Sequence, residues 1–549
     1  MAFGKKRRVI QELRSSQFET NIMNDTSQPN PEIPLDSLET CSTKSGNFAP
    51  NLVTTTLRPS PRAHHYATFR ETYTEPNAAS QRIYLFPAPS RAQGGLLEAF
   101  MSSANIHFEP LPVEDEECLA IGRTFVNRGQ CAPVVYITGN LIKYLLALRR
   151  KGMSDDDILH NYGFIMVKTS GGACRLPTYE EEYRKALKGI GLENFVIELI
   201  DIGLARQSVT GLRINRQFYL RIFLAIMLGD ILNDIERRVR PYEVTPGDTD
   251  RVMQQVRAMV GRSYRDDSDR ALTTALRLAR TMIESIPVDL AQVKPKVRIV
   301  GEFYVASTEG HCTGDMFRWL ESQGAEVAVR TVTIYLLHKV WRRIWMAEQE
   351  FRARRKRSIA DWRMFLKKSI KWRMLYLGLV RRHQRYTKLL GGYAYPLPRM
   401  STMLRLTKDL YHRAFFSGEG FMEIAEHIMA ARQNEADMVL SLKPFTCLPS
   451  VCSDGVQSKV EQEEPASVFL SLEMSGDAIA NSRSRIQMKL FEARELLESK
   501  LQQLSVRLGA SREEILRTVR DRKSHVKMLR IRKNALGCTF LSLAEELHQ

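Results

Sequence analysis

The most constraining stretch of this sequence is residues 436–458, which read ADMVLSLKPFTCLPSVCSDGVQS. The apolar run 438–442 is typical of a buried strand. Lys443-Pro444 ends that run, and a loop then presents Cys447 shortly before a second proline. A thiol in a proline-stiffened loop after a buried strand stands where an α/β fold carries its chemistry. The pattern therefore predicts an α/β fold with a functional site at Cys447.

Two further cysteines share the local pattern of Cys447. Cys131 precedes Ala-Pro and Cys174 precedes Arg-Leu-Pro, each beside a predicted strand or helix end. Glycine-rich and proline-bounded loops supply the backbone N–H donors that lower the pKa of a thiol, and thiolates are the cluster ligands of iron. We interpret the three cysteines as ligands of one metal cluster, which would leave one iron open to a substrate oxygen or to water. Buried structural thiols are the alternative, at about even odds, because cysteine is often buried.

The other five cysteines are weaker candidates. Cys312 follows His311 in the sequence GHCTG, and Cys452 lies close enough to Cys447 to replace it as a ligand. Structural or incidental roles are expected for Cys41, Cys118 and Cys538. Apart from Cys447 and Cys452, no cysteines are closely spaced, which argues against a secreted disulfide framework.

The alternation of apolar runs and helical periodicity predicts two Rossmann-like α/β lobes with helical inserts. We expect strands at 83–86, 106–111, 164–167, 195–202, 296–305, 324–329, 438–442 and 468–472. We expect helices at 96–103, 134–148, 179–189, 215–239, 248–286, 316–323, 331–390, 421–432, 481–508 and 511–549. Both lobes open as β-α-β, so they are candidates for a pseudo-repeat.

The predicted domain organisation starts with a disordered N-terminal tail, because residues 1–78 are rich in Ser, Thr, Pro and Asn and lack periodicity. The expected segments that follow are a first α/β lobe (79–205), a helical insert (206–292), the start of a second α/β lobe (293–335), a basic helical segment (336–416), the remainder of the second lobe (417–497) and a helical C-terminal extension (498–549).

Several blocks of the chain resemble the 2-hydroxyacyl-CoA dehydratase and CoA-activase superfamily, in particular the cluster-binding region of the large activase-like proteins. The blocks are GRTFVNRGQCAP (122–133), GGACRLPTYEEEYRKAL (171–187), RPYEVTPGDTD (240–250), GEFYVASTEG (301–310), GEGFMEI (418–424), VLSLKPFTCLPSVCSDGVQ (439–457) and FLSLEMSGDAIANSRSRIQM (469–488). The likeness covers about residues 82–497. Thr446 stands where the family usually has Gly, and no actin-like phosphate loops of an ATPase module precede residue 82.

The resemblance implies an oxygen-sensitive iron–sulfur cluster, of the 4Fe–4S type, between the two lobes, with Cys131, Cys174 and Cys447 at the family's cysteine positions. It implies low-potential electron transfer, or radical dehydration or reduction of an acyl-CoA-type substrate. The electron would come from a separate ATP-dependent activator protein, and a homo- or heterodimer fits the family.

Further site residues belong to this reading. Gly171, Gly172, Gly418 and Gly420 would let the backbone approach the cluster or substrate. The acids that we expect to handle protons are Glu302, Glu309 and Glu419.

The net charge of +18 is concentrated in one region. Residues 339–388 hold 17 Lys or Arg and 3 Asp or Glu, a net +14, interleaved with Trp, Phe and Tyr. This segment favours an amphipathic helical hairpin with solvated charges over a phosphate or nucleic-acid site by about three to two. A membrane-surface role is weaker. The rival function is therefore a non-enzymatic scaffold or nucleic-acid-binding protein that uses this segment. If the chain is an iron–sulfur protein instead, we do not expect a nucleic-acid partner.

The location expected from the sequence is the cytoplasm. No apolar run approaches the roughly 20 residues needed to cross a bilayer, and no apolar core follows the basic residues 1–8.

Overall fold

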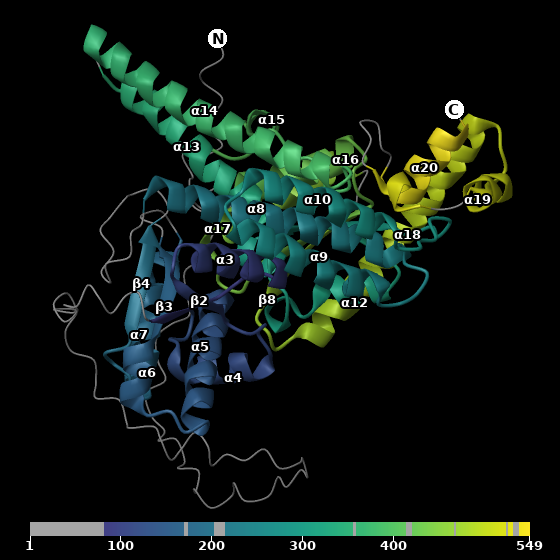
Figure 1. Ribbon diagram of the computed structural model, residues 1–549. Coiled ribbons are helices and arrows are strands. Elements are labelled where there is room, and N and C mark those ends of the chain that lie inside the picture. Colours follow the sequence, from purple (N-terminus) through teal and green to yellow (C-terminus); the bar gives the residue numbers. More distant parts are fainter. Residues whose placement is uncertain are drawn as a thin grey trace, which may run out of the picture. The chain divides into compact units, whose positions relative to one another are not determined.

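The computed structural model (Figure 1) describes residues 82–168, 174–201, 215–354, 358–412, 420–465, 468–522, 525–530 and 537–548, all within one compact unit. The predicted tail, 1–78, lies outside these residues, as do Gly171, Gly172, Gly418 and Glu419. The described chain is mostly helical and contains two small parallel sheets of four strands each. An α/β class is therefore confirmed, whereas a Rossmann-like identity for each lobe stays a prediction.

The first sheet has the strand order β2-β1-β3-β4, with all pairs parallel. Its strands are β1 (Ile83–Phe86), β2 (His107–Pro110), β3 (Tyr162–Lys168) and β4 (Val196–Asp201). The connecting helices are α3 (Arg91–Ser103), α4 (Glu116–Phe125), α5 (Ala132–Arg150), α6 (Asp155–Asn161), the 3₁₀ turn η3 (Leu176–Thr178) and α7 (Tyr179–Gly189).

The second sheet repeats this topology with the order β6-β5-β7-β8. Its strands are β5 (Lys296–Gly301), β6 (Glu326–Val329), β7 (Met438–Pro444) and β8 (Val468–Met474). Between them lie α11 (Phe303–Ser307), η5 (His311–Thr313), α12 (Met316–Ser322), α13 (Val332–Arg352), α14 (Ile359–Leu389), α15 (Met400–Leu406), α16 (Gly420–Arg432) and α17 (Leu448–Glu463). In each sheet the order in which strands are added reverses between the two central strands, β1 and β3 or β5 and β7. Parallel sheets usually bind ligands at such a point.

Further helices lie between the sheets in sequence and after the second one. The first group is α8 (Arg216–Val239), η4 (Arg240–Tyr242), α9 (Asp248–Arg265) and α10 (Asp269–Glu284). The second group is α18 (Ile479–Leu508), α19 (Arg512–Asp521), η6 (Val526–Leu529) and α20 (Thr539–His548). None of the described helices is long and apolar enough to cross a bilayer.

Alternating residues of the first sheet enter different cores. Tyr84 and Ile165 pack in one cluster with α3, α8 and α9, whereas Leu85 and Phe164 pack in another with α5 and α7. The second cluster also contains Leu440 of β7 and its neighbours in the second sheet. A single core therefore joins one face of each sheet. Every residue of β7 is buried, as expected for a central parallel strand covered on both faces.

The structure differs from the predicted elements after Gly301 and after Cys447. The predicted strand 296–305 ends at Gly301, whose φ is +117°, and Glu302 then caps α11 by accepting the N–H groups of Tyr304 and Val305. The helical regions expected at 248–286 and 331–390 each consist of two helices in the described residues; Ser268 begins α10 and Ser358 begins α14 as side-chain N-caps. Figure 1 shows α13 and α14 lying side by side. The loop expected after Cys447 is the first turn of α17.

Candidate metal centre

Cys131 and Cys447 each stand at the start of a helix, one in each half of the protein. Each is the N-cap of a helix, Cys131 of α5 and Cys447 of α17, and each has extended backbone and a proline in the first helical turn. A proline is tolerated there because the first N–H groups of a helix have no intrahelical partner. The Cys-x-Pro pattern therefore marks a helix start, where the helix dipole favours a thiolate.

Cys174 belongs to the segment that follows β3, and it precedes η3 and α7. Its Sγ accepts a hydrogen bond of 3.4 Å from the N–H of Leu176. Cys447 follows β7, which is the corresponding strand of the second sheet. Both thiols thus lie beyond the carboxyl ends of central strands, at the expected ligand-binding edge.

Thr446 connects the three cysteine-bearing loops. Its hydroxyl donates to the carbonyl of Gly129 at 3.2 Å, and it accepts from the guanidinium of Arg175 at 3.4 Å. Gly129 lies two residues before Cys131, and Arg175 directly follows Cys174. The structure therefore brings the loops of all three predicted ligands into contact.

Cys131 is buried and has a protein partner. Its Sγ shares a hydrogen bond of 2.8 Å with the hydroxyl of Tyr179, the first residue of α7. Burial raises the pKa of the Cys131 thiol to about 11; the Tyr179 hydrogen bond lowers this pKa, and the negative charges of Glu302 and Cys174 raise it. Cys131 is therefore a neutral thiol at pH 7 unless a metal ion displaces its proton.

Glu302 lies at the same strand edge. It directly follows β5, and its N–H donates to the carbonyl of Leu442 at the end of β7. Its carboxylate accepts N–H groups of Tyr304 and Val305 at 3.1 and 2.9 Å. Burial raises its pKa to about 7, although the two backbone hydrogen bonds lower it. A carboxyl group that titrates near neutral pH can both donate and accept a proton.

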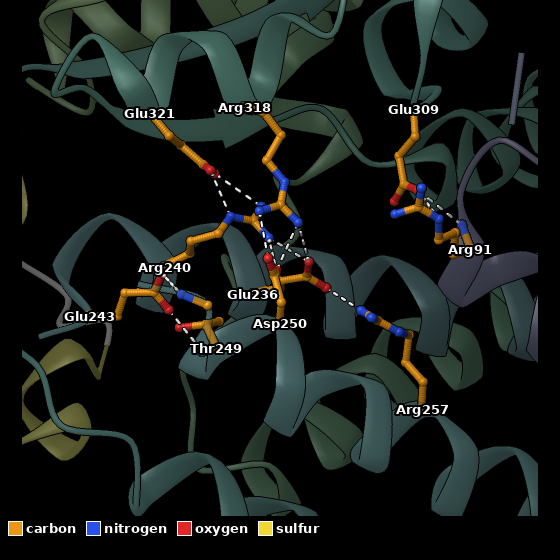
Figure 2. Close-up of polar contacts among 11 residues, drawn as sticks. Arg91, Glu236, Arg240, Glu243, Thr249, Asp250, Arg257, Glu309, Arg318 and Glu321 are labelled. Atoms are coloured by element: carbon orange, nitrogen blue, oxygen red, sulfur yellow. Dashed lines mark hydrogen bonds and ion pairs between the residues drawn. The ribbon is translucent and has the colours of Figure 1, made fainter. Parts of the chain in front are cut away.

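The other predicted acid and glycine have different surroundings. Glu309 accepts the N–H of Arg91 at 3.3 Å, at the start of α3 (Figure 2). Gly420 begins α16, and a Cβ at this position would lie 2.5 Å from the hydroxyl of Tyr411. The structure thus places Glu309 in an ion pair and packs Gly420 tightly against an aromatic ring.

The remaining described cysteines are dispersed, and none forms a disulfide. Cys452 is exposed on α17, whereas Cys118, Cys312 and Cys538 are buried. The pKa of Cys312 is raised well above its usual value, chiefly by burial. His311 shares a hydrogen bond of 2.7 Å between its Nδ1 and the Tyr136 hydroxyl. Among the described residues, no three or more His, Cys, Asp or Glu side chains are arranged to hold a single metal ion.

Sequence reasoning missed a buried polar network behind Cys447. The Lys443 ammonium, fully buried, pairs with Glu423 of α16 at 2.9 Å and with Asp454 of α17. Ser441 and Ser453 donate to the same Glu423 carboxylate, each at 2.8 Å. The network ties the end of β7 to α17, and so it positions the loop that carries Cys447. The signal available in the sequence was the lysine that directly follows the apolar run 438–442.

No protein-family model matches this chain, and a search of curated proteins finds no significant match.

Proposed function

We propose that this chain is an iron–sulfur protein in which Cys131, Cys174 and Cys447 bind one cluster of the 4Fe–4S type. It acts in low-potential electron transfer, or in the radical dehydration or reduction of an acyl-CoA-type substrate. A separate ATP-dependent activator protein supplies the electron.

The contact of the three cysteine-bearing loops through Thr446 is the observation that carries this proposal. The donor set suits the group, since thiolates are the usual ligands of iron–sulfur clusters. A cluster offers each thiolate a different iron, so its ligands need not converge as closely as ligands of one ion. The absence of a single-ion site among the described residues is compatible with this arrangement.

The chain's own residues would prepare the site in three ways. Cys131 and Cys447 are the N-caps of α5 and α17, where the positive end of the helix dipole favours a deprotonated thiol. The guanidinium of Arg175 lowers the pKa of Cys131. Glu302, with a pKa of about 7, would hold or release a proton beside the thiols. The cluster itself would supply one-electron chemistry.

Anaerobic purification followed by iron and sulfide analysis tests the proposal. We expect the wild-type protein to contain iron and acid-labile sulfide, and Cys447→Ala to lose most of both. Cys452→Ala is the matched control, because this thiol lies on the same helix and is exposed. An iron-free, colourless wild-type protein would refute the proposal, and equal loss in both variants would refute the assignment of Cys447.

Helix α14 favours a second candidate function, a scaffold that binds nucleic acid. Arg363, Lys367, Lys371 and Arg373 are exposed on this helix, and none has an acidic partner within the described parts of the chain. Unpaired cations along one helix fit a phosphate backbone. We expect DNA binding that weakens steeply with salt, measured by fluorescence anisotropy, and its loss when these four residues are changed to Gln. Wild-type protein without affinity at low salt would exclude this function.

A further inference from the structure

A charged cavity of about 760 Å³ lies away from the cysteine loops, among α3, α8, α9, α12 and the loop before η5. Its ionic lining consists of six arginines and four carboxylates, a net charge of +2: Arg91, Arg237, Arg240, Arg251, Arg257, Arg318, Glu236, Asp250, Glu309 and Asp315. The volume is within the range of small-molecule sites.

Most of these charges neutralise one another, as Figure 2 shows. Arg240 pairs with Glu236, Asp250 and Glu321, and the latter two contacts measure 2.9 and 2.7 Å. Arg318 binds Asp250 with two contacts of 2.7 Å, donated by its two terminal nitrogens. The wall formed by these residues is therefore a self-contained ion-pair network that supports the fold.

Arg237 differs from the other arginines of the cavity. It is 7% exposed, and its guanidinium lies 4.4 Å from the centre of the Phe317 ring, which also lines the cavity. It forms no hydrogen bond or ion pair with any residue that the structure describes. Its positive charge acts on Asp230 and Asp234, two buried carboxyls of the same helix whose pKa values burial raises to about 7 and about 6.

The Arg237 side chain lines the cavity without a hydrogen-bonding partner among the described residues, so its N–H groups are available to a ligand. The five N–H groups of arginine form a planar fork that matches the oxygens of phosphate. The Phe317 ring lies against one side of the Arg237 guanidinium. Arg91 and Arg251, both mostly exposed, line the same cavity.

We infer that this cavity binds a small organic molecule carrying a phosphate or diphosphate, and that Arg237 contacts the phosphate oxygens. A phosphate charge near −2 balances the net +2 of the lining, whereas a single carboxylate would not. The volume exceeds what inorganic phosphate alone would fill, so the ligand has an organic part. This inference does not depend on the presence of a cluster.

Calorimetric titration of the full-length protein with pyrophosphate, ADP, adenosine and succinate tests the inference. We expect the wild-type protein to bind ADP and pyrophosphate, and to bind adenosine and succinate at least about tenfold more weakly. Arg237→Gln should weaken the binding of both phosphate ligands at least about tenfold. Arg237→Lys keeps the charge without the fork, so it should recover part of that loss.

Arg238→Gln is the matched control. Arg238 is the next residue of α8, is equally buried at 6% exposure, and lines a separate cavity with Tyr395. It should retain wild-type affinity for both phosphate ligands. Circular dichroism and the melting temperature would verify that each variant is folded.

The inference is overturned if the wild-type protein binds neither phosphate ligand at millimolar concentration, or if folded Arg237→Gln binds both as tightly as the wild type. Loss of binding in folded Arg238→Gln alone would place the ligand in the other cavity. Succinate binding as tight as that of pyrophosphate would refute a preference for phosphate. Iron content does not enter any of these outcomes.

Discussion

Replacing Glu114 by Gln should remove a large part of the pH dependence of this protein's stability. Glu114 lies in the loop after β2, and it connects the two halves of the protein. Its Oε1 accepts the hydroxyl of Tyr304 in α11 at 2.5 Å, whereas its Oε2 is buried without a partner among the described residues. The carbonyl of Glu114 also accepts the N–H of His311. No cation pairs with this carboxyl group in the described structure.

Burial raises the pKa of Glu114 from 4.5 to about 8, although the Tyr304 hydrogen bond lowers it. The folded protein therefore holds a proton that the unfolded chain releases. The contribution of Glu114 to the free energy of unfolding is therefore most favourable below pH 4.5, and it decreases as the pH rises toward 8. Linkage between these two pKa values gives a loss of about 2.5 kcal/mol from pH 5 to pH 7. A glutamine does not titrate, so the variant avoids that loss.

Urea unfolding of the wild type and of Glu114→Gln at pH 5, 6, 7 and 8 would measure the effect. The difference in free energy of unfolding between the variant and the wild type should change by about 2–3 kcal/mol in favour of the variant from pH 5 to pH 7. Glu116→Gln, two residues away and exposed, is the control and should show no such gain. Parallel pH profiles for the wild type and Glu114→Gln would refute the reasoning.

Substitutions at Thr446 and Lys443 test the surroundings of Cys447. Thr446 has a φ of +66°, which is strained for a β-branched residue, so Thr446→Gly should be about 1 kcal/mol more stable to urea than Thr446→Ala. Both variants lack the hydroxyl that binds Gly129, and their comparison therefore isolates the backbone; equal stabilities would contradict the strain. Lys443→Met leaves the buried Glu423 carboxylate without its ammonium partner and should lower the free energy of unfolding by about 3–5 kcal/mol. Adding Glu423→Gln should restore part of that loss in the same urea assay, and no recovery would count against the charge argument.

Several features of this protein follow from local sequence alone. The predicted strand 438–442 lies within β7, and the predicted helix 179–189 matches α7. Both could be predicted because an apolar run and a helical periodicity are patterns of neighbouring residues. The predicted ligands Cys131 and Cys447 are N-caps, and a proline stands in the first turn of each of the two helices. The φ of +66° at Thr446 is one that glycine adopts without strain, and nothing in the local sequence indicated it.

Local patterns also misled at points where two structures compete. Gly301-Glu302 interrupts an apolar run that reads as one strand, and the cap formed by the Glu302 carboxylate turns the following residues into α11. The polar sequence after Cys447 lacks a clear apolar face, so α17 was not predicted; its contacts with α16 and the Lys443 network stabilise it. In both cases a side-chain contact outweighed the propensity of the segment.

Local sequence patterns are enough to give the alternation of strands and helices, the clustering of positive charge in 339–388 and the proline that follows each of the three predicted cysteine ligands. Long-range packing decides that Thr446 meets Gly129, 317 residues away, that Glu114 lies against Tyr304, and that Arg237 has no hydrogen-bonding or ionic partner among the described residues. Such contacts depend on strand order and on which faces of two sheets share a core. The spacing of residues along the sequence does not reveal the strand order or the shared faces, because both depend on how the whole chain packs.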